Sequence, residues 1–376
     1  MLFSSGGHLF VFECEGCGAE LTAPLSQVVL PVHAHQKYGN GIQLPVLMES
    51  GTFAVEPEPW GPPWRRWEEI DPDELAARGI YAPVHVLSDG APGAIVIAPG
   101  DVRGTVLIPE KCGGYCCGLD GADGPNVACE TCGLPVASRI DDCSLWQAVW
   151  LAPGAVRRRR VDGTDAAPLS WAELAAQGKR TPPFEPITAW DGPRLGLNHW
   201  WSWSPRWEAA AGRALAHLLT ASGGRSVTVP DGLAEEMFQR FLDTLLPAGP
   251  PARRAVLAGP GPPAPDADVD ILIVPVHPQT GKTWAPPSPA ASAPPVPLPF
   301  GVWMCLAFPE PHLPAPASGV MPDGVLRDDP PAPHPCIRFR PDPGIFWHTL
   351  VRLPAVRSQW LREILRTSRR TRARLF

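Results

Sequence analysis

The sequence predicts an α+β fold, in which a β-rich N-terminal domain precedes a small α/β domain and a C-terminal helix. Three patterns support this prediction. Short β-branched runs between glycine and proline turns fill the first 160 residues, two amphipathic helical patterns alternate with strand-like runs after residue 205, and an apolar stripe with helical spacing lies close to the C-terminus. A chain of 376 residues is long enough for two or three domains that each bury a core.

The composition argues against several classes of protein. The 50 prolines and 36 glycines stay below the roughly 25–30% at which low complexity becomes the default, so we expect folded units joined by stiff connections. A net charge of −6 gives no general attraction to nucleic acid or to anionic membranes. Because the sequence has no apolar run of about 18 residues and its start lacks a basic region, neither a membrane span nor a signal peptide is expected.

These features favour a cytoplasmic location. In that reducing compartment disulfides are rare, and the chain has ten cysteines, several of them in CxxC spacing. The cysteines therefore indicate metal binding rather than disulfide bonds.

The β-rich N-terminal domain is predicted to span residues 1–163. Three runs have the β-branched character of short strands, "PVHVLSDG", "GAIVIAPGD" and "RGTVLIPE", and each ends in turn residues. One short helix is expected among them, because Asp71 can cap it, Pro72 suits its first turn and Gly79 can end it.

A connection rich in proline and tryptophan is predicted over residues 164–205. It contains one short helix, "SWAELAAQG", which Ser170 and Glu173 can cap. Its end reads "HWWSWSPRW", and we expect these tryptophans to pack against the domains on either side, because large apolar side chains are costly to leave in water.

The α/β domain is predicted over residues 206–284. Ser204 and Pro205 begin one amphipathic helix and Asp231 begins a second. The runs "RSVTVPDG", "RAVLAG" and "DVDILIVPV" have the character of strands.

The rest of the chain is predicted to be a linker followed by a C-terminal segment. Residues 285–299, "APPSPAASAPPVPLP", have polyproline character, and we expect no core there. In residues 300–376, "FGVWMCLAF" is expected to be a strand, and Trp360, Leu361 and Leu365 belong to an amphipathic helix. From Arg352 onward the chain has eight arginines and one acid, Glu363, which could contact phosphate or an acidic protein surface.

Two short stretches share the pattern Cys-Glu-x-Cys-Gly, "CEGCG" from Cys14 and "CETCG" from Cys129. A CxxC pair directs two sulfurs at one ion from a tight turn, and the glycine after it allows the chain to reverse. With Cys17 and Cys132, the two stretches resemble the paired knuckles of zinc-ribbon proteins. The resemblance covers about eight residues at each end, and it implies a four-thiolate zinc site that is structural, because four thiolates leave no position for water.

Other pairings stay open at this point. Cys112 and Cys116 could join Cys129 and Cys132, or the N-terminal pair could bind together with His33 and His35. A second zinc site could form from the remaining cysteines of the N-terminal domain, although small buried thiols are an equally simple interpretation. Those cysteines are Cys112, Cys116, Cys117 and Cys143.

One stretch suggests an enzymatic alternative. In "AGPGPPAPDADVDILIV", Asp268 and Asp270 open a strand after a glycine turn, which resembles the core of the DNA polymerase β-like nucleotidyltransferases. The resemblance implies that the two carboxylates hold Mg²⁺, although a proline stands where that family has a serine. The simpler interpretation is a pair of solvated acids at the start of a strand.

The sequence therefore predicts a zinc-stabilised binding or scaffold protein. Its expected partner is a protein or a nucleic acid that contacts the arginine-rich C-terminus, and no membrane is expected to take part. The alternative is a Mg²⁺-dependent transferase centred on Asp268 and Asp270. The sequence does not predict an oligomeric state.

Overall fold

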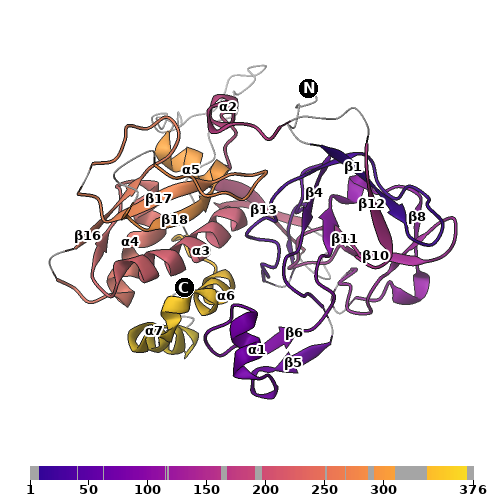
Figure 1. The fold of residues 1–376 in the computed structure, drawn as a ribbon, viewed down its shortest axis with the longest axis horizontal. Coiled ribbons are helices and arrows are strands. Elements are labelled where there is room, and N and C mark those ends of the chain that lie inside the picture. Colours follow the sequence, from indigo (N-terminus) through magenta and orange to yellow (C-terminus); the bar gives the residue numbers. More distant parts are fainter. Residues whose placement is uncertain are drawn as a thin grey trace.

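The structure, a computed structural model, describes residues 8–39, 41–61, 63–114, 116, 118–161, 167–190, 197–249, 252–266, 268–286, 292–309 and 337–370. Two lobes lie side by side (Figure 1). One is built from strands of the first 160 residues, and the other from helices and strands that follow residue 200. The predicted combination of a β-rich N-terminal part, an α/β part and a C-terminal helix is confirmed.

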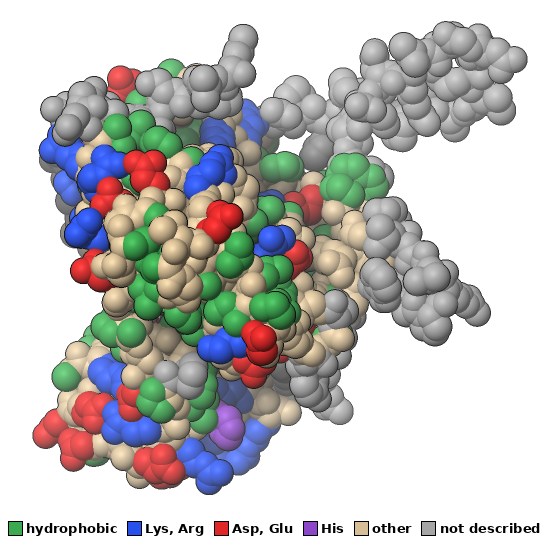
Figure 2. Space-filling model, turned by 90° about the vertical axis from the view of Figure 1, so that its right-hand side faces the viewer, with side chains coloured by type: hydrophobic (Ala, Val, Ile, Leu, Met, Phe, Trp, Pro, Cys, Tyr) green, Lys and Arg blue, Asp and Glu red, His purple; other side chains and the backbone are tan. Residues whose placement is uncertain are grey.

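The surface of the β-rich lobe has a mixed character. On the face shown in Figure 2, basic and acidic side chains are interspersed, with apolar side chains between them. Within the described residues, none of the helices combines the length and the apolar character that crossing a bilayer requires.

A nine-stranded sheet forms the β-rich lobe. Its strands follow the order β12-β1-β2-β4-β7-β11-β10-β9-β8, and all neighbouring pairs are antiparallel except β2 and β4. The strand bounds are β1 Leu9–Cys14, β2 Leu25–Gln27, β4 Thr52–Val55, β7 Ile95–Ile97, β8 Thr105–Leu107, β9 Val127–Cys129, β10 Pro135–Ile140, β11 Ala148–Leu151 and β12 Val156–Arg160. The predicted strands in "GAIVIAPGD" and "RGTVLIPE" are confirmed as β7 and β8.

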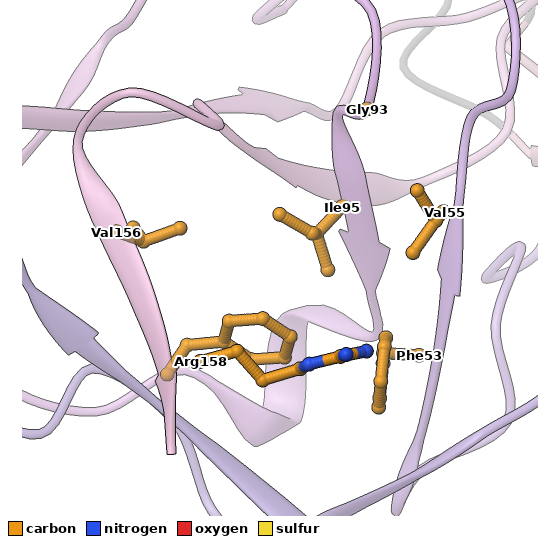
Figure 3. Close-up of a pocket in the computed structure, with 7 residues that line it drawn as sticks. Phe53, Val55, Gly93, Ile95, Val156 and Arg158 are labelled. Atoms are coloured by element: carbon orange, nitrogen blue, oxygen red, sulfur yellow. The ribbon is translucent and has the colours of Figure 1, made fainter.

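The sheet buries both of its faces. Because side chains alternate along a strand, Phe53 and Ile97 point into one core while Ala54 and Val96 point into the other. The first core also contains Cys14 and Cys129 at one end. This core also borders a hollow of about 180 Å³ between β1, β4, β7 and β12, which Figure 3 shows with Arg158 across it.

A small unit of the N-terminal part packs on the C-terminal helices. It consists of β5 (Trp64–Arg66), α1 (Pro72–Ala77) and β6 (Val86–Ser88). As predicted, the Asp71 side chain caps α1 by accepting from the N–H of Asp73. Figure 1 shows this unit beside α6 (Pro343–Arg352) and α7 (Gln359–Arg370), and the N–H of Tyr81 donates to the carbonyl of Val351 at 2.8 Å.

A long hairpin connects the two lobes. β13 (Phe184–Trp190) pairs with β14 (Leu197–Trp203) and also with the short β3 (Ile42–Gln43) of the β-rich lobe. Its far end enters the other core, where Trp203 is 1% exposed, whereas Trp200 and Trp201 are 37% and 44% exposed. The segment predicted as a connection therefore contains regular structure, with α2 (Trp171–Gln177) and its Ser170–Glu173 capping box ahead of the hairpin.

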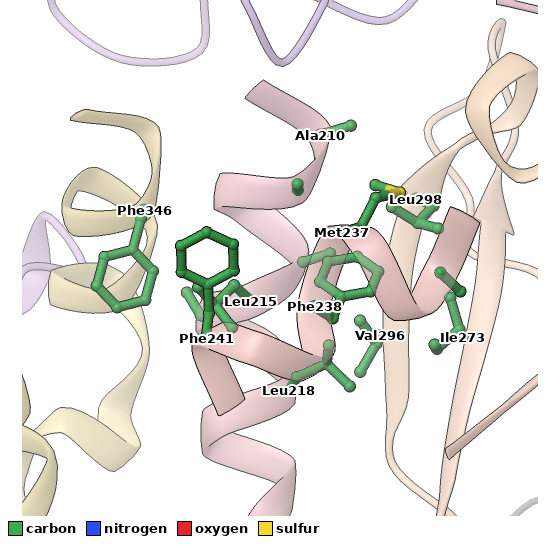
Figure 4. Close-up of a cluster of buried hydrophobic side chains, with 14 of the residues drawn as sticks. Ala210, Leu215, Leu218, Met237, Phe238, Phe241, Ile273, Val296, Leu298 and Phe346 are labelled. Carbon is green, nitrogen blue, oxygen red and sulfur yellow. The ribbon is translucent and has the colours of Figure 1, made fainter. Parts of the chain in front are cut away.

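The second lobe is a four-stranded parallel sheet with helices on one face. Its order is β15-β16-β17-β18, with β15 Val227–Thr228, β16 Arg253–Leu257, β17 Ile271–Val276 and β18 Pro295–Pro299. The helices α3 (Pro205–Ser222) and α4 (Leu233–Leu245) cover it, and Figure 4 shows their side chains meeting those of Ile273, Val296 and Leu298. Ser204 caps α3 as predicted, but α4 begins after Gly232 without a side-chain cap, although Asp231 was expected to supply one.

Strand β18 lies in the stretch predicted to be a linker without a core. Its side chains Val296 and Leu298 are fully buried, and prolines occupy the alternate positions Pro295, Pro297 and Pro299. Alternate residues of a strand point their N–H groups to the same side, and β18 is the edge of the sheet. The N–H groups that the three prolines lack would point to the open side of the sheet, away from β17. An edge strand tolerates proline at such positions, because no hydrogen bond to a neighbouring strand is lost.

The strand predicted in "FGVWMCLAF" is incorrect, because these residues form helix α5 (Phe300–Ala307). A helix buried on nearly all sides has no polar face, so its periodicity does not distinguish it from a buried strand. The predicted C-terminal helix is confirmed as α7, and Leu361 and Leu365 are buried on its inner side. Short 3₁₀ turns complete the described elements, at Trp67–Glu69, Pro99–Asp101, Pro109–Lys111 and Pro354–Arg357.

Candidate metal centre

Two tight turns with the same backbone geometry carry the CxxCG stretches. Each begins at the last residue of a strand, β1 for the first and β9 for the second. In each turn the N–H of the first cysteine bonds to the carbonyl five residues on, and the N–H of the glycine bonds to the carbonyl of that cysteine. These bonds are Cys14 to Ala19 and Gly18 to Cys14, both 2.8 Å, and Cys129 to Leu134 and Gly133 to Cys129, both 2.9 Å.

The glycine of each turn is needed for its backbone conformation. Gly18 has a φ of 77° and Gly133 a φ of 74°, in the left-handed region that other residues seldom adopt. The apolar residues that follow, Leu21 and Val136, are fully buried and anchor each turn to the core of the lobe. The repeated pattern in the sequence therefore encodes a repeated structure.

The structure brings the four cysteines together, and we call them the four-cysteine cluster. The sulfurs of Cys14, Cys17, Cys129 and Cys132 all lie within 4.8 Å of one another. The Sγ–Sγ distances are 3.5 Å from Cys14 to Cys132 and 3.6 Å from Cys17 to Cys129. Four sulfurs at Zn–S bonds of about 2.3 Å in a tetrahedron are about 3.8 Å apart, so the cluster needs only small shifts to surround one ion.

The cluster lies where the curled sheet meets itself. β1 is the second strand in the sheet order and β9 the eighth, so the cluster joins opposite ends of the sheet. Backbone contacts join the same ends, because the N–H of Arg103 donates to the carbonyl of Leu21 at 2.8 Å and the N–H of Ala23 donates to the carbonyl of Asp101 at 2.9 Å. A metal ion in the cluster would add a direct bond across this seam.

Without a bound ion, the thiols of the four-cysteine cluster have different pKa values. At Cys17 the Ala19 N–H favours the thiolate, but burial and bonding to the three other sulfurs outweigh it and raise the pKa to about 12. At Cys129 burial opposes ionisation, but the N–H groups of Cys132 and Thr131 and the neighbouring thiols lower the pKa to about 7. Burial also raises the pKa of Cys14. A bound cation would supply the positive charge that four thiolates require.

The alternative pairings predicted from the sequence are not formed. His33 packs on Trp146 with ring centroids 4.3 Å apart, and burial together with Arg206 lowers its pKa to about 3. His35 instead bonds to Glu56 and stacks on Trp60. Neither histidine belongs to a group of metal-ligating side chains among the described residues.

Cys112 also lies outside the four-cysteine cluster. Its thiol donates to the carbonyl of Ile108 at 3.1 Å. A second group does form from Cys116, Cys143 and Asp142, whose donor atoms lie within 4.8 Å of one another. Cys117, the remaining member of the predicted second set, lies outside the described residues, as does Cys336.

Asp142 was not predicted from the sequence as a ligand. The prediction considered only cysteines for the second set, whereas the stretch "RIDDCSLW" places two acids directly before Cys143. A carboxylate adjacent to a cysteine is a signal that could have identified it, because zinc accepts carboxylate oxygen as well as thiolate.

The aspartates of the enzymatic alternative lie at the beginning of β17 and contact arginines. Asp268 pairs with the Arg254 guanidinium at 2.7 Å, and Asp270 accepts from the Arg254 backbone N–H at 2.9 Å and lies 3.8 Å from Arg225. Parallel sheets bind ligands at the carboxyl ends of their strands, which is the opposite end. Within the described residues, the two aspartates do not join a group of three or more metal-ligating side chains.

Comparison with protein-family models, with curated proteins and with solved structures gives no match to this chain.

Proposed function

We propose that this chain is a zinc-stabilised binding or scaffold protein that acts in a reducing compartment such as the cytoplasm. The observation that supports this proposal is the geometry of the four-cysteine cluster. Four sulfurs at tetrahedral spacing fill the coordination sphere of Zn²⁺ and leave no position for a water or substrate. Such an ion contributes to folding rather than to a reaction.

The position of the cluster fits that structural role. Cys14 and Cys129 are fully buried in the core of the β-rich lobe, while Cys17 and Cys132 are exposed at its end. A zinc ion held there would link the first turn, the second turn and the strands between them into one folded unit. The rest of the surface is then free to serve as the binding face.

The proposed binding surface is the outer face of α7. Leu361 and Leu365 hold the inner face of this helix against the second lobe. The outer face carries three exposed arginines against one acid, Glu363, which pairs with Arg366. These arginines are Arg362, Arg366 and Arg370, whereas Arg369 donates to the carbonyl of Pro83 at 2.7 Å. A row of guanidinium groups on a rigid helix suits a phosphate backbone or an acidic protein surface.

Elemental analysis of the full chain, purified without added metal, tests the zinc part of the proposal. We expect zinc in the wild type. The Cys129→Ser variant should lose the zinc of the four-cysteine cluster, and the sulfur of Cys17, no longer bound to metal, should then react with a thiol-alkylating reagent. Cys305→Ser is the matched control, because the buried thiol of Cys305 donates to the carbonyl of Thr181 and lies outside both cysteine groups. Zinc content and alkylation that are the same in both variants would refute a four-thiolate site.

Binding to a labelled RNA or DNA oligonucleotide over a salt series tests the partner. Each phosphate contact that is lost reduces the slope of log affinity against log salt by about 0.9 for duplex DNA, so Arg362→Gln, Arg366→Gln and Arg370→Gln together should reduce it by about 2.7. The exposed Arg103→Gln is the control for a change of charge elsewhere. Binding that does not depend on α7 would exclude this surface, and binding to an acidic peptide alone would identify a protein partner.

A further inference from the structure

We propose that Cys116, Asp142 and Cys143 form a second metal site, which binds Zn²⁺ through two thiolates and one carboxylate. We call these three residues the Cys/Asp cluster. The Sγ atoms of its two cysteines are 3.2 Å apart, and all three donor atoms lie within 4.8 Å of one another. This site is separate from the four-cysteine cluster and does not depend on the proposed binding function.

The backbone itself brings the three side chains together. Leu119 and Asp141 form a two-bond bridge, with N–H to carbonyl distances of 3.1 and 2.8 Å. Gly118 lies directly against this bridge, since a Cβ atom there would be 2.0 Å from the carbonyl oxygen of Asp141. Gly118 and Leu119, which follow Cys116 closely in the chain, are thereby held next to Asp141 and Asp142, so backbone contacts favour the cluster before an ion binds.

The backbone after Cys143 adopts an unusual conformation. Ser144 has a φ of 70°, and it is the single non-glycine residue with positive φ among the described residues. This conformation costs on the order of 1–3 kcal/mol, so it persists only where neighbouring contacts hold it. Here the Ser144 N–H donates to Ile42 at 2.8 Å and its carbonyl accepts from Tyr38 at 2.9 Å. The chain therefore turns sharply after Cys143, and Cys143 and Asp142 are held in place from this side as well.

The chemistry of the donors selects the ion. Asp142 and Cys143 are 7% and 3% exposed, and a buried carboxylate next to thiolates is favourable when a cation neutralises the group. Asp142 Oδ1 accepts from the Cys143 N–H at 2.8 Å, which orients the carboxylate. Thiolate sulfur with carboxylate oxygen is a zinc ligand set, whereas Mg²⁺ and Ca²⁺ prefer oxygen alone.

Three ligands leave one coordination position of a tetrahedral ion to a fourth group. Cys116 is exposed, so this position is on the side where solvent reaches the cluster. The expected ligand there is a water molecule or a soluble anion or thiol, which is the arrangement of zinc sites with an exchangeable ligand. Binding of Zn²⁺ releases the two thiol protons to solvent.

The test is the zinc content of the full chain, purified under reducing conditions and dialysed, for the wild type and single variants. The wild type should hold two zinc ions per chain, Cys143→Ser and Asp142→Asn should each hold one, and Cys112→Ser should hold two. Cys112 is the matched control because it lies in the same segment but bonds to Ile108. In Cys129→Ser the ion of the Cys/Asp cluster should remain, which separates this site from the four-cysteine cluster.

Spectroscopy with Co²⁺ in place of zinc identifies the ligands. The thiolate-to-cobalt absorption of the Cys129→Ser protein should disappear when either Cys143→Ser or Asp142→Asn is added. A wild type that retains one ion per chain, and keeps it in Cys143→Ser, would overturn the proposal and leave the four-cysteine site intact. A Cys116–Cys143 disulfide found by mass spectrometry in the reduced protein would overturn it too.

Discussion

Glu208 links protonation to stability, and Glu208→Gln tests that link. This carboxyl group lies on α3 at the junction of the lobes, where its Oε2 accepts a hydrogen bond from the Tyr38 hydroxyl at 2.5 Å. Burial, helped by nearby Asp342 and Glu185 and opposed by the Tyr38 bond and Arg340, raises its pKa from 4.5 to about 8. The folded state therefore keeps a proton on Glu208 over a range in which the unfolded chain has lost it.

The sign of the pH effect follows from that difference. Between pH 4.5 and 8 the folded state binds one more proton than the unfolded state at Glu208, so rising pH lowers the free energy of unfolding. The limiting slope is about 1.4 kcal/mol per pH unit, which gives a loss of up to about 2.7 kcal/mol between pH 5 and pH 7. Glutamine cannot ionise, and its carbonyl oxygen can still accept the Tyr38 bond.

Urea denaturation of the wild type and Glu208→Gln at pH 5, 6, 7 and 8 measures the effect. The free energy of unfolding of the variant minus that of the wild type should increase with pH and level off near pH 8. Glu235→Gln, an exposed change on α4, is the control and should give a difference that does not vary with pH. A constant difference for Glu208→Gln would show that this carboxyl group is not protonated in the folded state.

Three further predictions concern packing and metal. Gly212→Ala should destabilise the fold by about 1–3 kcal/mol in thermal unfolding, because the added Cβ would lie 2.4 Å from the carbonyl oxygen of Asp342. The control is Gly154→Ala, where a Cβ meets open space, and it should change the stability by less than about 0.5 kcal/mol. Leu298→Ala should cost about 2–5 kcal/mol and the exposed Pro295→Ala much less, and equal effects in urea denaturation would contradict an edge strand that buries Leu298. A strong zinc chelator should reduce amide-exchange protection in β1 and β9 and leave that of α3 unchanged; equal loss in all three would contradict a local role for the ion.

Helix boundaries were the most predictable part of the fold. The Ser170–Glu173 capping box and the Ser204 cap of α3 occur where the sequence predicted them, because a cap depends on residues that are adjacent in the chain. The start of α4 was less predictable. Asp231 is a good capping residue, but the backbone at Gly232, with a φ of 82°, begins the helix one residue later.

The order of the strands could not be read from the sequence. The runs that form β6, β7 and β8 follow one another in the chain and suggest a meander, yet β6 pairs with β5, β7 lies at the centre of the large sheet and β8 lies at its edge. Strand pairing is decided by contacts between distant residues, and the sequence pattern of a strand does not identify its neighbour.

The edge strand β18 was missed because its composition suggests the opposite of a strand. Three prolines in five residues normally exclude a sheet, and only the edge position, known from the structure, makes them compatible with pairing. By contrast, the four-cysteine cluster was predictable, because a repeated CxxCG pattern carries its turn geometry with it. The Cys/Asp cluster was predictable only in part, since Asp142 gives no comparable pattern.

The 111 residues between Cys17 and Cys129 do not argue against a shared metal site. Closing a flexible loop of that length costs about 4 kcal/mol beyond the constant term, since the cost grows as (3/2)RT times the logarithm of length. Zinc bound to a structural site contributes about 10–16 kcal/mol at neutral pH, which exceeds that cost. Moreover, the hydrogen bonds of Arg103 with Leu21 and of Ala23 with Asp101 already hold the two ends of the sheet together. The ion would therefore bind a nearly assembled site, and its free energy would stabilise the closed sheet rather than be used to form it.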